Sequence, residues 1–291
     1  MNLDKLNKDI LINVNGTLVH KDDALISVYE SGYLMGDGIW EGIRLINNQW
    51  IFLDEHIDRL FEGLAAIDIT LHLSKEQLID ELIKTQQANK MTDFAHARLM
   101  VTRGIKSKPF QQPNLVVGEP TLVIIMEHSD PNVKHKGIKM VTVPQIRGIP
   151  TTQDPKLNSH SKLNCILACI QANKAGADEG LMLDINGHVN TTNSCNFFIV
   201  KNGEVWTSTG DYCMNGITRK KIIMLCKNHN IPVFEKNYLL EDVYKADECF
   251  VTGTLGSLTP VTELDDKKFD ISKFKVMQLL NDLYQDLVSN L

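Results

Sequence analysis

The sequence predicts an α+β fold, in which antiparallel sheets and amphipathic helices are largely segregated along the chain. Several stretches alternate apolar and polar residues on both sides of an Asn-Gly or Asn-Asn pair, which is typical of a β-hairpin. Other stretches carry apolar residues at helical spacing. Because strands and helices come in runs, the pattern favours α+β over a doubly wound sheet.

The first part of the chain predicts two hairpins, two helices and two further strands. The hairpins are expected over residues 9–20 and 39–53, with turns at Asn-Gly and Asn-Asn. The helix over 54–69 has a 3.6-residue apolar period and an acidic start, and the helix over 74–90 begins with Ser74 and Gln77 in capping-box spacing. The strands are expected over 96–104 and 120–128.

The second part of the chain predicts a strand at 138–146 and a helix from the "KLNCI" stretch to near Gly176. Two hairpins with Asn-Gly turns follow at 180–190 and 195–208. The remaining elements are helices over 217–230 and 272–290 and a strand over 248–254 that ends in Gly253-Thr254.

Length and charge are those of an ordinary globular protein. The chain has 291 residues, 43% hydrophobic content and a formal net charge of −6, which argues against nucleic acid or an anionic membrane as the main partner. The polar, turn-rich stretch "SDPNVKHKG" predicts a connector at 129–137 between a small domain, 1–128, and a large domain, 138–291. No apolar run approaches a membrane span or a signal-peptide core, so we expect a cytoplasmic protein.

The six cysteines are scattered and form no CxxC pair, which favours reduced, buried thiols over a disulfide framework or a metal site.

Three segments are suited to holding an anion. "NGITRK", residues 215–220, places Gly216 before a helix, so backbone N–H groups and the helix dipole face its entrance. "VTGTLGS", residues 251–257, is a Gly/Thr/Ser turn after a strand. "EHIDRL" places Arg59 on a helix. Each signal alone is more often an ordinary structural turn, since Gly-Thr turns are common.

In combination, these segments resemble the class IV aminotransferases, which are fold-type IV pyridoxal-phosphate enzymes. The family includes branched-chain and D-amino-acid aminotransferases and aminodeoxychorismate lyase. The matching stretches run in family order and cover almost the whole chain: "GYLMGDGIWEGIR", "EHIDRL", "VTRG", "AGADEGLMLDINGHV", "NGITRK" and "ADECFVTGT". The resemblance implies a small N-terminal α/β domain, a larger C-terminal domain with a barrel-like sheet, pyridoxal 5'-phosphate as cofactor, and a homodimer.

The resemblance also implies where the cofactor binds. The residues that would grip the cofactor phosphate are Arg59, Ile217, Thr218 and Thr254. The family places a glutamate against the pyridine nitrogen in a V-x-E-G-x-x-x-N segment, and the matching position here is Thr191. A hydroxyl stabilises a protonated ring much less than a carboxylate does, so we expect Thr191 to favour slower or narrower chemistry.

The substrate side is implied in the same way. The residues that would line it from the small domain are Tyr33, Trp40 and Arg44, and the amides of Leu255 and Gly256 would face the substrate carboxylate. Arg98 matches the arginine of the branched-chain enzymes' Tyr-x-Arg motif, with His96 in place of the tyrosine. Alternatively, Trp40 belongs to the core and the two arginines make structural ion pairs.

The Schiff-base lysine is the second departure from the family pattern. Without gaps, "DPKLNSHSKLN" places Asn158 at the lysine position and Lys162 at a tyrosine position. If the helix starts near Ser159, positions 158 and 162 share a face, and Lys162 could reach the cofactor from one turn along. Apolar neighbours, Leu163 and Ile166, would lower its pKa by desolvation. Lys162 is therefore favoured over Lys156, which is expected to be solvated; the third alternative is that neither lysine reacts.

The leading hypothesis is an aminotransferase that moves an amino group between an amino acid, with a branched-chain one as a candidate, and a 2-oxo acid. Lys162 would be the Schiff-base lysine. One alternative is a lyase similar to aminodeoxychorismate lyase. Another is a non-catalytic protein that binds pyridoxal phosphate or a small anion, which Asn158 and Thr191 together make credible. No metal, nucleic acid or membrane is expected as a partner.

Overall fold

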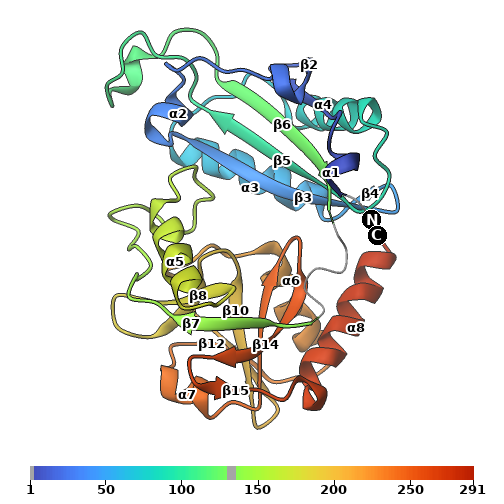
Figure 1. Cartoon of the computed structure of the whole chain (residues 1–291), viewed down its shortest axis with the longest axis vertical. Coiled ribbons are helices and arrows are strands. Elements are labelled where there is room, and N and C mark those ends of the chain that lie inside the picture. Colours follow the sequence, from blue (N-terminus) through green and yellow to red (C-terminus); the bar gives the residue numbers. More distant parts are fainter. Residues whose placement is uncertain (1–2, 130–135) are drawn as a thin grey trace. The chain divides into compact units, whose positions relative to one another are not determined.

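The computed structural model describes residues 3–129 and 136–291 (Figure 1). The chain divides into two compact units. Unit 1 comprises Met1–Pro131 and Leu157–Lys162, and unit 2 comprises Asn132–Lys156 and Leu163–Leu291. Most of the predicted connector, 129–137, falls on residues 130–135, outside the described residues. The segment Leu157–Lys162, which the predicted large domain 138–291 includes, groups with unit 1.

Unit 1 is built on an antiparallel six-stranded sheet with the strand order β2-β1-β6-β5-β3-β4. Its strands are β1 (Leu11–Val14), β2 (Thr17–His20), β3 (Gly38–Ile46), β4 (Gln49–Trp50), β5 (Ala95–Thr102) and β6 (Thr121–His128). The hairpins β1–β2 and β3–β4 turn at Asn15-Gly16 and Asn47-Asn48, where positive φ angles suit Asn and Gly. Both predicted N-terminal hairpins are therefore confirmed.

Two helices of 14 residues, α3 (Leu53–Ala66) and α4 (Lys75–Ala88), pack on one face of this sheet (Figure 1). Strand alternation sends Ile39, Ile43 and Leu45 of β3 into the core that these helices cover. The predicted capping box of α4 is present, since Ser74 and Gln77 bond reciprocally. The short helices α1 (Leu3–Leu6) and α2 (Ser31–Met35) complete the unit together with 3-10 turns at Lys21–Asp23 and Pro113–Leu115.

The segment before the next helix is extended, so the expected helix start near Ser159 is wrong. The Trp40 N–H donates to the Asn158 carbonyl at 3.0 Å, and the His160 N–H donates to the Gly38 carbonyl at 2.9 Å. These bonds pair residues 158–160 with the beginning of β3, and α5 (Leu163–Lys174) starts only after Lys162. Positions 158 and 162 therefore do not share a helical face.

Unit 2 contains a nine-stranded sheet, in which six strands close into a ring. The ring runs β10-β13-β14-β7-β8-β9, and the pairing of Thr191 with Asn196 joins β9 back to β10. The strands are β7 (Ile138–Thr142), β8 (Glu179–Leu183), β9 (Val189–Thr192), β10 (Asn196–Lys201), β11 (Glu204–Thr207), β12 (Val233–Glu235), β13 (Glu248–Gly253), β14 (Ser257–Leu264) and β15 (Lys267–Lys268). This closed ring confirms the predicted barrel-like sheet and the α+β class.

The helices of unit 2 are α5, α6 (Ile217–Asn228), α7 (Leu240–Tyr244) and α8 (Val276–Ser289), with a 3-10 turn at Ile271–Lys273. The β8–β9 and β10–β11 hairpins turn at the predicted Asn-Gly pairs. Phe198 and Phe250 are register partners and stack with ring centroids 5.1 Å apart, which anchors the interior of the sheet. Within the described residues, no helix is long and apolar enough to cross a membrane.

All six cysteines are free, as predicted, although Cys165, Cys169 and Cys195 are only half-buried.

Candidate active site

The sheet face of unit 1 opposite the helices carries most of the predicted substrate-side residues. Trp40 and Arg44 alternate with the core residues of β3, and His96 and Arg98 alternate with those of β5. Arg44 and His96 are register partners, and Arg98 lies opposite Gly42. Tyr33 lies apart from these strands on α2 and is 71% exposed. The alternation of β3 and β5 thus gathers these two arginines, the histidine and the tryptophan on one surface.

Two cations lie beside the same indole ring. The Arg98 guanidinium carbon is 3.9 Å from the centre of the Trp40 ring, and the Lys162 Nζ is 5.6 Å from it. Both distances are in the range of cation–π attraction. The Trp40 indole N–H donates to the Ser159 carbonyl at 3.3 Å, so the segment that carries Lys162 is fixed to β3. Trp40 is therefore a half-buried platform for two positive charges and not a core residue.

The surroundings of Lys162 differ from those expected. Leu163 and Ile166 are 67% and 52% exposed, so they do not desolvate the amine, and the expectation based on them is wrong. Asn158, at the family's lysine position, is buried, while Lys156 is exposed as predicted. Burial lowers the pKa of His160, Glu30 opposes this, and Arg98 and Lys162 lower it further. His160 is therefore neutral near pH 7 and adds no third positive charge.

Arg59 is held by a fully buried carboxylate. Its Nε and Nη2 donate to the two oxygens of Glu41, both at 2.7 Å, and His56 Nδ1 lies 2.7 Å from one of the same oxygens. Burial alone raises the pKa of Glu41, but the hydrogen bonds from His56 and Arg59 outweigh it and hold the pKa below the usual 4.5. Glu41 thus fixes the direction of the Arg59 guanidinium and offsets its charge.

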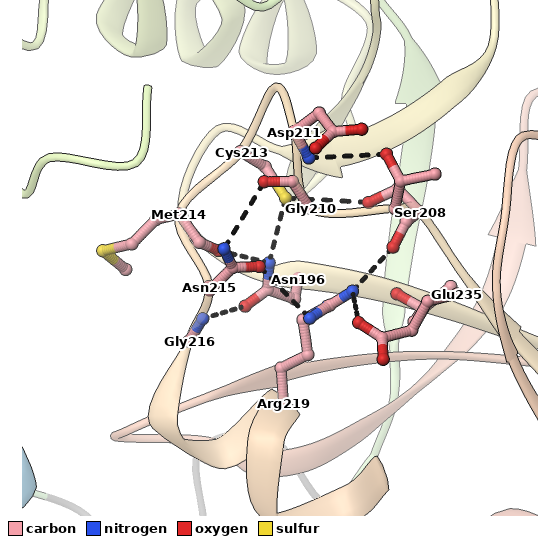
Figure 2. A network of polar contacts seen from close by, with 12 residues as sticks. Asn196, Ser208, Gly210, Asp211, Cys213, Met214, Asn215, Gly216, Arg219 and Glu235 are labelled. Atoms are coloured by element: carbon pink, nitrogen blue, oxygen red, sulfur yellow. Dashed lines mark hydrogen bonds and ion pairs between the residues drawn. The ribbon is translucent and has the colours of Figure 1, made fainter. Parts of the chain in front are cut away.

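The beginning of α6 in unit 2 has first-turn backbone N–H groups that no side chain of the described residues caps, and Figure 2 shows Gly216 and Asn196 at this point. Gly216 is the N-cap of the helix. Asn196 accepts from the Gly216 N–H at 3.2 Å and donates to the Met214 carbonyl at 2.9 Å. A Cβ at Gly216 would clash with Asn196 Oδ1, so a larger residue here would have to displace the Asn196 side chain. The predicted residues Ile217 and Thr218 form the first turn beyond this point.

Arg219 ties the loop before α6 to its surroundings, as Figure 2 shows. Its Nη2 donates to the Ser208 carbonyl at 2.6 Å and pairs with Glu235 at 2.9 Å, and its Nη1 donates to Asn215 Oδ1 at 3.2 Å. The side chain is almost completely buried. The loop conformation that presents the N-terminus of α6 therefore depends on one arginine.

Replacing Arg219 by methionine is expected to destabilise the protein by about 2–3 kcal/mol, because a buried carbonyl loses its donor. Affinity for pyridoxal phosphate is expected to fall more than affinity for pyridoxal, since the loop supports the phosphate end. Urea unfolding and binding titrations measure both effects, with the exposed neighbour Lys220→Met as control. Equal losses for the two ligands would contradict this role of the loop.

The predicted turn after β13 lies between paired residues. Gly253 and Ser257 are register partners, and Thr254, Leu255 and Gly256 connect them. Thr252 immediately before the turn is buried, and its hydroxyl has no hydrogen-bond partner among the described residues. Thr252 lies opposite Asn196 in the sheet, so a donor without a partner in the described part of the chain stands beside the residue that holds Gly216.

Thr191 closes the ring of strands and uses its hydroxyl internally. Its Oγ1 donates to the Cys195 carbonyl at 2.6 Å. The adjoining turn is held by Thr192, whose Oγ1 accepts from the Cys195 N–H and lies 2.7 Å from a Glu179 oxygen. Position 191 therefore offers oxygen lone pairs and no carboxylate.

The comparisons with known proteins agree with this architecture. Residues 38–264 match the family model described as amino-transferase class IV. This protein belongs to the class IV aminotransferase family. Enzymes of this family use pyridoxal 5'-phosphate, so the predicted family, enzyme class and cofactor are confirmed at the level of the family.

The relatives are named for different substrates. A Methanocaldococcus jannaschii protein with the provisional name branched-chain-amino-acid aminotransferase is 37% identical over 95% of this chain and 96% of its own length. The D-alanine aminotransferase of Listeria monocytogenes is 33% identical over 87% of this chain and 86% of its own length. The structure of the Thermoproteus uzoniensis branched-chain aminotransferase with norvaline has a TM-score of 0.88 at 26% identity, covering 96% of this chain and 95% of its own.

The residues of unit 2 fit the phosphate of this cofactor. The first turn of α6 without a side-chain cap, the glycine N-cap packed against Asn196, and the buried Thr252 hydroxyl without a partner in the described part of the chain together provide donors that suit an anion. Sequence reasoning missed Asn196 and Thr252 as parts of this arrangement. It also missed Glu41, although a carboxylate at the core position between Ile39 and Ile43 signals a buried cation partner.

Proposed function

We propose that this protein is a pyridoxal-phosphate-dependent aminotransferase that moves an amino group between an amino acid and a 2-oxo acid. The observation that carries the proposal is the set of donors that suit an anion at the start of α6, in a chain of the class IV family. When bound, the cofactor supplies the group that receives the amino nitrogen and a ring that withdraws electrons.

The cofactor phosphate is proposed to bind to the first-turn amides of Ile217 and Thr218, with hydroxyls from Thr218 and Thr254. Arg59 is proposed as a further phosphate ligand, oriented by Glu41 and His56. Because Glu41 offsets its charge, Arg59 contributes direction and hydrogen bonds more than net attraction. Thr191 is proposed to lie at the pyridine ring.

Lys162 is proposed as the lysine that attaches the cofactor and moves a proton at the substrate α-carbon. Asn158 has no amine. Lys156 is exposed and belongs to unit 2, whereas Lys162 belongs to unit 1. Lys162 lies beside Trp40 and Arg98, so its amine is on the sheet face of unit 1 that carries the proposed substrate contacts. A deprotonated amine is the nucleophile that covalent attachment requires.

The substrate is proposed to contact Tyr33, Trp40, Arg44 and Arg98 and the amides of Leu255 and Gly256. Arg98 supplies a cation for a substrate carboxylate, because its guanidinium is stacked on Trp40 and the residue is exposed. The names of the relatives support a branched-chain amino acid as one substrate. The D-alanine aminotransferase among the relatives supports an amino acid of D-configuration as an alternative.

A non-catalytic pyridoxal-phosphate-binding protein is a second candidate. Asn158 and Thr191 favour it, because the residues that the family uses for attachment and for ring protonation are both replaced. Such a protein would keep the donors at the start of α6 and lose the chemistry.

A homodimer is proposed from an exposed apolar surface of unit 1. The surface is formed by the segments around Tyr29 and Ile105. They are adjacent, because the Lys106 N–H donates to the Tyr29 carbonyl and the backbones of Glu30 and Ile105 form an antiparallel bridge. Its exposed members are Leu25, Ile26, Val28, Tyr33, Ile105, Phe110 and Val117. We expect Leu25→Asp/Val28→Asp to convert a dimer to a monomer in light scattering, and a native protein that is already monomeric would contradict this.

The cytoplasmic location stays a prediction.

The experiment that tests the function combines absorbance with a substrate panel. Protein loaded with pyridoxal phosphate is expected to be yellow, to bleach with its amino donor, and to recover with a 2-oxo acid. L-leucine, L-valine, L-glutamate and D-alanine distinguish the donors. Stable colour that no donor bleaches would support the non-catalytic candidate, and pyruvate release from aminodeoxychorismate would support the lyase.

A further inference from the structure

Arg147 is a buried cation that has no carboxylate partner among the described residues. It follows β7, and its backbone N–H donates to the Leu183 carbonyl at 2.9 Å. The residue is 9% exposed. Its Nη1 donates to Cys165 Sγ at 3.0 Å, and its Nε is buried and has no hydrogen-bond partner within residues 3–129 and 136–291. A sulfur atom is a weak acceptor, so the guanidinium is poorly satisfied.

The contrast with Arg219 shows what is missing. Arg219 is more deeply buried and its Nε also has no partner among the described residues, but its terminal nitrogens have the Glu235 carboxylate and a backbone carbonyl as acceptors. The buried carboxylate of β8, Glu179, accepts from the Ser194 and Thr192 hydroxyls instead. Buried charges are normally paired, because desolvation of an unpaired ion is costly. Arg147 therefore keeps a buried N–H that is free, within the described residues, to donate to an acceptor on a ligand.

Arg147 and Thr191 lie on the same side of the ring of strands. Thr191 and Met182 are register partners, and Met182 packs against Ala168 of α5. Cys165, which accepts from Arg147, lies three residues before Ala168 on α5. The two residues therefore lie on the same face of this helix. Arg147 is thus placed at the side of the sheet on which the Thr191 side chain lies.

Cys213 and Asn196 provide a second link between Arg147 and Thr191. Burial raises the pKa of Cys213, a hydrogen bond from Ser208 lowers it, and the charges of Arg219 and Arg147 lower it further. The charge of Arg147 therefore also acts at Cys213, in the loop before α6. Its sulfur lies 3.7 Å from Asn196 Nδ2, and Asn196 pairs with Thr191. Arg147 contacts α5 through Cys165.

Resting on the proposed function, we propose that Arg147 donates a hydrogen bond to the pyridine nitrogen of bound pyridoxal phosphate and keeps this nitrogen unprotonated. The Thr191 proton is already donated to the Cys195 carbonyl, so Thr191 cannot supply that bond. A guanidinium only donates, and its charge opposes a second positive charge beside it. An unprotonated ring nitrogen is an acceptor, and it would satisfy the Nε–H of Arg147.

The test is 15N NMR of the protein loaded with pyridoxal phosphate labelled at the ring nitrogen, recorded across pH. The native protein is expected to show an unprotonated nitrogen at neutral pH. Arg147→Met should raise the protonation midpoint by about 1–3 pH units, because a like charge is removed. Arg147→Lys keeps the charge and should preserve the native midpoint, which also covers the case in which the methionine variant does not fold. Thr191→Glu supplies a carboxylate and should give a protonated nitrogen.

Lys139→Met is the control, because this exposed lysine of the same unit pairs with Glu263 and should not affect the midpoint. A protonated nitrogen in the native protein, or an unchanged midpoint in Arg147→Met, would overturn the role of Arg147 while leaving cofactor binding intact. Failure of the native protein to bind pyridoxal phosphate saturably would overturn both this inference and the proposed function.

Discussion

Replacing Lys162 by alanine is expected to abolish covalent cofactor attachment and to lower the rate of amino transfer by about 10⁴-fold. The physical reason is that the amine serves twice, as the nucleophile that attaches the cofactor and as the group that moves the substrate proton. Borohydride reduction of the yellow native protein should fix the label to the chain, and peptide mapping should locate it at Lys162.

Lys156→Ala is the matched control, since Lys156 is exposed and lies six residues away in the same polar stretch. It should keep both the label and the rate. A label on Lys156, or an undiminished label in Lys162→Ala, would assign the attachment elsewhere. Colour that borohydride fixes to no lysine would favour the non-catalytic candidate.

Glu41→Gln is expected to destabilise the protein by about 3–5 kcal/mol, because it leaves the buried groups of Arg59 and His56 without their carboxylate. The pKa of Glu41 is held below 4.5, so its contribution to stability is complete above pH 4.5 and is lost as the pH falls through the lowered value. The stability of Glu41→Gln should not show this loss as the pH falls. Urea unfolding between neutral and acid pH measures it.

Glu62→Gln on the exposed side of α3 is the matched control and should change stability by no more than about 0.5 kcal/mol. If Glu41→Gln unfolds like this control at neutral pH, the buried pair does not stabilise unit 1. If the variant keeps the native acid dependence, another group titrates in that range.

The hairpins and long helices were predictable because their signals are local. Asn15-Gly16 needs only its own backbone preference to specify a turn, and Ser74 with Gln77 needs only helical spacing to specify a cap. The extended segment at Asn158 was not predictable in this way. Its structure comes from hydrogen bonds to β3, more than a hundred residues earlier, and such pairing overrides local propensity.

In the candidate site too, local features were predictable from the sequence and features that depend on tertiary contacts were not. The first turn of α6 was predictable, because Gly216 before a helix is a local anion-binding signal. Arg147 was not, because "VPQIRGIP" has no pattern that marks a buried cation, and its importance follows only from the absence of a carboxylate partner in the described part of the fold. The Arg98 stack on Trp40 likewise depends on strand register and not on sequence spacing.

The two departures from the family pattern give a consistent physical picture. Asn158 is buried against β3, where its carbonyl accepts from the Trp40 N–H, and Thr191 donates its proton within the barrel. Neither residue carries the amine or the carboxylate that the family uses at its position. Lys162 and Arg147 are the cations to which we assign the tasks of cofactor attachment and contact with the ring nitrogen.

The most direct test of the central claim is amino transfer itself. The protein loaded with pyridoxal phosphate is incubated with a 15N-labelled amino acid and an unlabelled 2-oxo acid, and the amino acid formed from the 2-oxo acid is analysed by mass spectrometry. We expect 15N in that product, at a rate that Lys162→Ala reduces by about 10⁴-fold and Lys156→Ala leaves unchanged. No 15N in the product with any donor, from protein that binds the cofactor, would contradict this expectation.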